Sequence, residues 1–128
     1  MQELLFNTVD GTGVKLMQAK KAVILALAED SDEIRFELTF SQEEFKRLFE
    51  NLESLACEIW EGLVPKEATS AGSDYWEYYD RRLDNNGYLS ASTRKCTLYI
   101  ERPARTNKKL YQFNKRKMES FLYDYKAK

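Results

Sequence analysis

Histidine is absent from this chain of 128 residues, and cysteine and proline occur only twice each. Histidine has an ordinary pKa close to neutrality, so it is the commonest general base and a leading transition-metal ligand. Its absence excludes Ser-His and Cys-His nucleophile pairs and histidine-based zinc sites. The composition therefore predicts a protein that is not an enzyme and that holds neither a metal nor another cofactor.

Long apolar runs are also missing. The longest one, Ala22–Ala28, is far shorter than the roughly 20 residues that span a bilayer. The first residues lack the basic start and apolar stretch of a secretory signal. The two cysteines, Cys57 and Cys96, are too few for a disulfide framework and match no metal-binding spacing. We therefore expect a cytoplasmic protein without membrane contact, in which both cysteines are buried as small apolar side chains.

Charge is abundant but unevenly distributed. Residues 1–68 contain 7 Lys and Arg against 14 Asp and Glu, whereas residues 69–128 contain 13 against 7. The steepest stretch, residues 94–117, has nine basic residues and a single acid, Glu101. A folded chain of this length has a radius of gyration of about 14 Å, well above the Debye length of about 8 Å at physiological salt. The acidic half therefore cannot neutralise a distant basic surface, which a polyanion would meet as positive.

Aromatic residues lie within this basic stretch, and the combination is typical of proteins that bind single-stranded nucleic acid. Cations neutralise phosphates while rings stack on bases. The last three cations fall in the first turn of a predicted helix, where free backbone N–H groups favour an anion. An ordinary solvated surface, with its rings packed inside, is the alternative. The predicted nucleic-acid-binding residues are Arg94, Lys95, Tyr99, Arg102, Arg105, Lys108, Lys109, Tyr111, Lys115, Arg116 and Lys117.

Protein binding is the second hypothesis, and two groups of residues support it. Four aromatic residues within five positions exceed what one buried face can hold, and exposed rings are favoured protein anchors; they are Tyr75, Trp76, Tyr78 and Tyr79. Acidic side chains of the first half could instead imitate a phosphate backbone; they are Glu29, Asp30, Asp32, Glu33, Glu43, Glu44, Glu50, Glu53 and Glu58. Either group suits a small inhibitor or adaptor of the kind carried by mobile elements and phages. A homodimer is a further expectation, because sheet edges need covering.

The apolar pattern predicts an α+β fold within a single domain. Two related units, residues 1–62 and 74–128, would each place antiparallel strands before one amphipathic helix packed on the sheet, with a linker at 63–73. Strict alternation makes 34–40 the clearest strand. The glycines of the turn at 10–13 suit positive φ, whereas segments 15–28 and 74–83 also allow helix. Strands are expected at 4–9, 14–18, 23–28, 34–40, 88–92, 95–101 and 108–113.

Both predicted helices carry start signals. Ser41 and Glu44 match a capping box, in which each side chain bonds the other residue's free backbone N–H. An apolar stripe runs from Phe45 to Ile59, and the helix is expected to end near Gly62. Asn114 is a favourable N-cap for the second helix.

The segment Arg35–Ser41, running into Glu44–Phe49, resembles the last strand and helix of a repeat in the PUR-alpha family of single-stranded nucleic-acid-binding proteins. It is also similar to the strand-to-helix junction of the PC4 and Whirly type transcriptional cofactors. The resemblance implies four strands plus a helix, used twice, with curved sheets that hold single strands through basic and aromatic side chains. This chain departs from those families because its first unit is acidic, which would confine binding mainly to the second unit.

Overall fold

The computed structural model describes residues 3–67, 88–102, 104–105 and 109–127. These residues form seven strands and two helices, which confirms the α+β class. In chain order the elements are β1 (Glu3–Asn7), β2 (Gly13–Ala19), β3 (Ala22–Leu27), β4 (Arg35–Thr39), α1 (Gln42–Ile59), β5 (Tyr88–Ser92), β6 (Thr97–Glu101), β7 (Lys109–Phe113) and α2 (Lys115–Ala127). Segment 15–19 is strand, so its helical alternative is wrong, and segment 74–83 lies outside the described residues.

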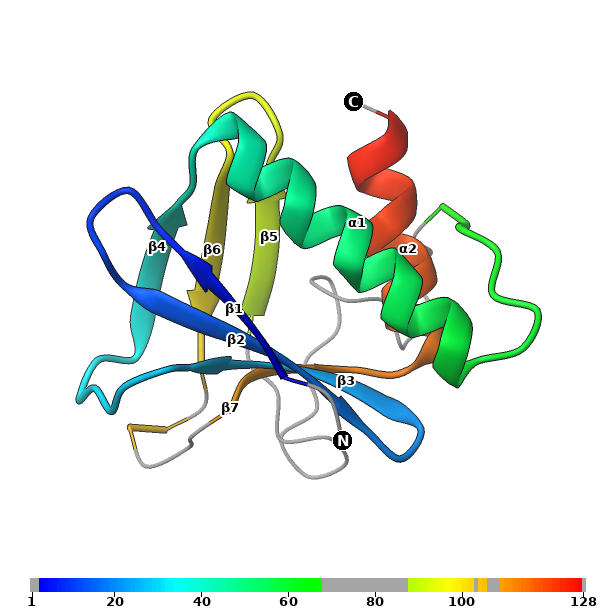
Figure 1. The fold of residues 1–128 in the computed structure, drawn as a ribbon, viewed down its shortest axis with the longest axis horizontal. Coiled ribbons are helices and arrows are strands. Elements are labelled where there is room, and N and C mark those ends of the chain that lie inside the picture. The colour runs from blue at the N-terminus through cyan, green and yellow to red at the C-terminus, as the bar shows by residue number, and fades with distance from the viewer. Residues whose placement is uncertain (1–2, 68–87, 103, 106–108, 128) are drawn as a thin grey trace.

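The strands form two antiparallel sheets (Figure 1), one in the order β1-β2-β3-β7 and the other in the order β4-β6-β5. Strand β7 of the second half pairs with β3, and β4 of the first half pairs with β6. Because each sheet takes strands from both halves, the structure does not confirm two related units. The expected linker at 63–73 lies only partly within the described residues.

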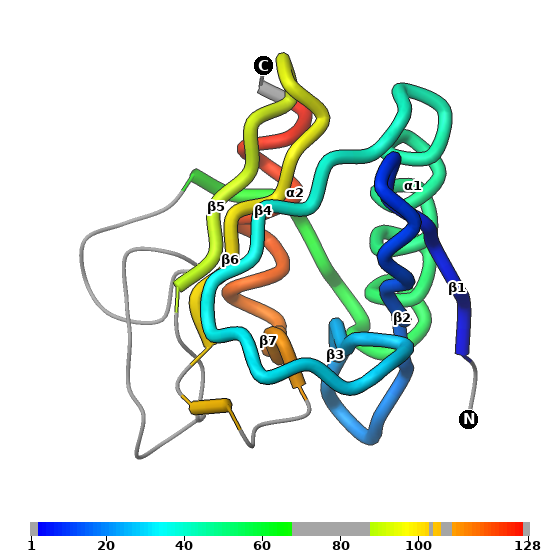
Figure 2. Tube along the Cα trace, turned by 90° about the vertical axis from the view of Figure 1, so that its left-hand side faces the viewer, coloured from blue at the N-terminus to red at the C-terminus, as the bar shows by residue number. Residues whose placement is uncertain are grey.

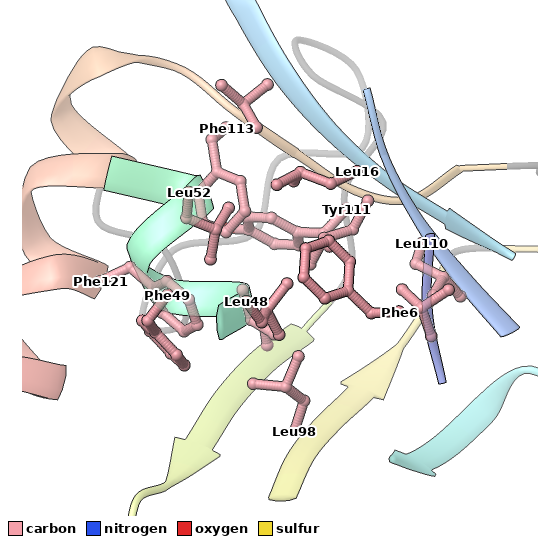
Figure 3. Packing of buried hydrophobic residues seen from close by; sticks show 14 of the residues in the cluster. Phe6, Leu16, Leu48, Phe49, Leu52, Leu98, Leu110, Tyr111, Phe113 and Phe121 are labelled. Carbon is pink, nitrogen blue, oxygen red and sulfur yellow. The ribbon is translucent and has the colours of Figure 1, made fainter. Parts of the chain in front are cut away.

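One apolar core joins both sheets and both helices. The alternation that predicted the strands is observed: Phe6 of β1 and Leu16 of β2 face inward, as Leu98 of β6 does from the other sheet. Figure 3 shows Leu48 of α1 among these core side chains and Phe49 beside Phe121 of α2. Helix α1 therefore packs on the sheets with the stripe that its sequence predicts.

The start of α1 corrects one detail of the predicted capping box. The Ser41 hydroxyl accepts a hydrogen bond from the Glu44 backbone N–H at 3.1 Å, as expected. The Glu44 carboxylate, however, accepts from the Asn7 backbone N–H at 3.0 Å and from the Arg47 guanidinium. Glu44 therefore ties α1 to β1 through Asn7, while Arg47, one turn along the same helix, supplies a charged donor.

The prediction that both cysteines are buried is wrong. Cys57 is exposed and Cys96 is half-buried. Cys57 lies on the outer side of α1, since the buried stripe takes Leu52, Leu55 and Ala56 instead. In the described part of the chain, neither helix is both long and apolar enough to cross a membrane.

Candidate functional site

The basic residues predicted to bind nucleic acid lie on several elements of the described structure. Arg94 and Lys95 are exposed in the turn between β5 and β6, whereas Arg102 and Arg105 follow the opposite end of β6. A strand of five residues spans about 16 Å, so β6 separates the two pairs. Tyr99 is half-buried between them, and Lys108 lies outside the described residues.

Three of the residues predicted to contact nucleic acid have buried side chains. The Tyr111 ring is fully buried in the core, and this burial raises the pKa of its hydroxyl. Arg102 is buried because its guanidinium donates to the carbonyls of Glu33 at 2.8 Å and Ser31 at 2.6 Å. Lys117 is also buried, with its ammonium 5.8 Å from the centre of the Tyr111 ring. None of the three side chains lies at the surface where a polyanion would bind.

The other cations near α2 bind carbonyl oxygens. The Lys115 ammonium donates to the Glu61 carbonyl at 3.1 Å, the Arg116 guanidinium donates to the Glu67 carbonyl at 2.9 Å, and the Lys109 ammonium donates to the Gln112 side chain at 2.8 Å. Because Glu61 follows the C-terminal end of α1, the Lys115 charge there is stabilised by the helix dipole. Asn114 accepts from the Lys117 backbone N–H at 2.8 Å, so the expected cap forms.

The described residues predicted for protein binding lie on two parts of the fold. The aromatic residues 75–79 lie outside the described structure. Glu43, Glu50 and Glu58 are exposed on the outer side of α1, whereas Glu29 and Glu33 belong to the segment between β3 and β4. This second acidic group lines a hollow of the surface, and the α1 group does not.

The hollow, which we term the acidic groove, encloses about 640 Å³ between β4 and the hairpin of β1 and β2. In Figure 2, β4 faces the viewer beside β1 and β2, and segment 28–34 joins β3 to β4 below them. The volume lies within the range of about 300–1,000 Å³ that is typical of binding pockets. Apolar side chains of both walls, including Leu5, Leu27 and Phe36, also line the groove.

The charge of the acidic groove is strongly negative. Among the described residues that line it, five are acidic and one is a cation, Arg35, whose guanidinium donates to Glu101 at 3.1 Å. The five acidic residues are Asp10, Glu29, Asp30, Glu33 and Glu37. A neighbouring hollow shares Glu29 and Asp30 and adds the cations Lys15, Arg102 and Arg105. The described lining of the acidic groove itself has a net negative charge, so it favours a cationic ligand. Among the described residues, no three potential ligands of the His, Cys, Asp and Glu types come together in a metal-binding group.

The rim of the groove at the β1–β2 turn is held by a small hydrogen-bond network. The Asp10 carboxylate accepts from the Thr8 hydroxyl and from the Thr12 backbone N–H at 3.1 Å. Both hydrogen bonds lower the pKa of Asp10 below its ordinary value, and the bond from Thr8 has the larger effect. The carboxylate is charged at neutral pH. Gly11 has a φ of 91°, which fits the positive φ expected in this turn.

The floor of the groove depends on a second glycine of the same turn. A Cβ atom on Gly13 would lie 2.8 Å from the Cβ of Ala28, closer than such atoms pack. The Gly13 carbonyl accepts from the Ala28 backbone N–H at 3.0 Å. Gly13 thus lets the start of β2 meet the chain just after β3, a close approach that the turn sequence alone did not reveal.

No family model matches this chain, and the chain has no detectable similarity to a curated protein or to a solved structure.

Proposed function

We propose that this protein is a non-catalytic binding protein whose partner is a protein with a positively charged segment, held in the acidic groove. One observation carries the proposal: among the described residues that line the hollow, five are acidic and the one cation, Arg35, is paired with Glu101. Complementary charge across an interface accelerates encounter and selects the partner. The apolar residues Leu5, Leu27 and Phe36 supply contact area that a purely electrostatic surface lacks.

A selection from a random ten-residue peptide library at 50 mM salt tests this function. We expect the captured peptides to be enriched in Lys and Arg relative to the input library. The double charge reversal Glu33→Lys with Glu37→Lys should remove that enrichment, because it changes two of the five groove carboxylates. Each exposed ion pair contributes about 0.2–1 kcal/mol, so the affinity of a captured peptide should fall about tenfold.

A matched control variant reverses two charges outside the groove. Glu50→Lys with Glu58→Lys alters the exposed side of α1 by the same amount without touching the groove. This variant should select the same basic peptides as the unmodified chain. Absence of basic enrichment, or an equal loss in both variants, would contradict binding in the groove.

Binding of nucleic acid through the second half stays a prediction. Among the described cations predicted to contact nucleic acid, Arg94, Lys95 and Arg105 are exposed. Titration of labelled single-stranded DNA and RNA at several salt concentrations examines this alternative directly. A steep salt dependence that Arg94→Glu with Lys95→Glu removes would favour it over the acidic groove.

A further inference from the structure

Among the described residues, no strand pairs with the edge of β4 that faces the acidic groove. The Arg102 backbone N–H donates to the Ile34 carbonyl at 2.9 Å, and the Phe40 backbone N–H donates to the Cys96 carbonyl at 2.8 Å. In an antiparallel ladder, every second residue exchanges bonds with its partner strand. The backbone groups of Phe36 and Leu38 therefore point toward β6, whereas those of Arg35 and Glu37 point the other way.

The outward direction of these groups is confirmed at the end of the strand. The Thr39 carbonyl, which has the same parity as Glu37, accepts from the Val9 backbone N–H of the β1–β2 turn at 2.8 Å. Both Arg35 and Glu37 line the acidic groove. No backbone partner for their N–H and C=O groups occurs among the residues that the structure describes.

Strand β1, the outer strand of the other sheet, shows how this fold covers an edge. The Arg47 guanidinium donates to the Leu5 carbonyl at 2.6 Å, and the Asn7 backbone N–H donates to the Glu44 carboxylate at 3.0 Å. Side chains of α1 thus occupy the free groups of β1. Proteins commonly cover or charge their edges to prevent unwanted pairing. The β4 edge is charged but uncovered, and it opens into a hollow.

We infer that the partner binds as an extended strand added to β4, with its backbone hydrogen-bonded to Arg35 and Glu37; this inference rests on the proposed function. Strand addition combines main-chain bonds, which provide affinity, with alternating side-chain contacts, which provide specificity. Since Thr39 is already bonded to Val9, the added strand has room for about four residues, or roughly 13 Å.

The charge of the groove selects the occupant. An antiparallel pair of two copies centred on Phe36 would set Arg35 of one copy opposite Glu37 of the other, but it would also bring together two grooves whose described lining has five acidic residues and one cation each. The net repulsion between the grooves therefore opposes pairing of β4 with itself. A segment in which cationic and apolar residues alternate suits both walls, because successive side chains of a strand point to opposite faces. The cations would meet Glu37 and Asp10, and the apolar side chains would meet Phe36 and Leu27.

The probe is the fluorescein-labelled peptide Lys-Val-Lys-Val-Lys-Val with blocked ends, measured by fluorescence anisotropy at 50 mM salt. In two further peptides the backbone nitrogen is methylated, at every lysine in one peptide and at every valine in the other. Only one set of N–H groups faces β4 in a strand complex. One methylated peptide should therefore bind at least about fivefold more weakly than the parent, while the other binds like the parent.

The variant Glu37→Pro removes the edge N–H without removing a ladder bond to β6, since proline is tolerated where its nitrogen faces away from the sheet. Glu37→Gln is the matched control, because it removes the same charge and keeps the N–H. We expect Glu37→Pro to weaken binding of the parent peptide at least about fivefold more than Glu37→Gln does. Far-UV circular dichroism monitors the fold of both variants.

Hydrogen exchange on the unmodified chain gives a readout that needs no variant. The amides of Arg35 and Glu37 should exchange quickly in the free protein and slowly with the parent peptide, whereas those of Phe36 and Leu38 are protected in both states. Equal binding of all three peptides, without slowed exchange, would overturn strand addition and leave the acidic groove as the binding site. No binding of the parent peptide overturns both proposals. A dimer that Glu37→Pro converts to monomer would make a second copy the occupant and overturn the inference.

Discussion

The ring of Phe49 connects the two helices, and its removal is the most informative test of the core. The ring centre lies 3.9 Å from that of Tyr125 with nearly parallel planes, 5.0 Å from that of Phe121 and 4.9 Å from that of Phe45. Burial of a phenylalanine side chain contributes about 1.5–3 kcal/mol, and each aromatic pair adds about 0.5–1.5 kcal/mol. Phe49 is 1% exposed, so Phe49→Ala also leaves a cavity. We expect a loss of about 3–5 kcal/mol.

Urea denaturation monitored by far-UV circular dichroism measures this loss. Domains of this kind are stable by about 5–15 kcal/mol, so the midpoint should move strongly, and the melting temperature should fall by about 10–20 °C. Phe49→Leu is the comparison variant, because it removes the ring contacts but keeps more of the buried volume, so it should cost less than Phe49→Ala. A cost of Phe49→Ala below about 1.5 kcal/mol, or no measurable cost of Phe49→Leu, would refute the contribution of the stacked rings between α1 and α2.

Two further predictions concern the helix starts. The Arg47 hydrogen bond lowers the pKa of Glu44 below its ordinary value of 4.5, so this pair stabilises the folded state above that pH and the contribution is lost as the pH falls through the lowered pKa. The difference in unfolding free energy between the unmodified chain and Glu44→Gln should therefore shrink from pH 7 to pH 3, and a difference independent of pH would contradict the assignment. Asn114 caps α2, so Asn114→Ala should destabilise the protein by about 0.5–2 kcal/mol and Asn114→Asp by much less; thermal melts compare them, and equal losses would argue against the cap.

Local patterns predicted most elements of this fold. The alternation at 34–40 depends only on which face of a strand is buried, and β4 was found at Arg35–Thr39. The prediction that a helix starts after Ser41 depends on hydrogen bonds between residues close in the sequence, and α1 begins at Gln42. The assignment of strands to sheets was not predictable, because β7 pairs with β3 across more than 80 intervening residues.

The candidate site was much less accessible from the sequence. The basic composition of residues 94–117 suggested a surface, but Arg102 bonds carbonyls between β3 and β4, and Lys115 bonds a carbonyl after α1. Both partners are distant in the chain. The acidic residues Glu29 and Glu33 were recognised as a candidate face, yet the groove they line exists only because β4 lies beside the β1–β2 hairpin.

The amino-acid sequence by itself determined where strands and helices form, since periodicity, caps and turn residues act between neighbours. It also determined the charge of each half. The tertiary structure decided which charges meet solvent, which bind carbonyls, and which strand edge stays open. Those outcomes depend on contacts between distant segments, and local chemistry does not encode them.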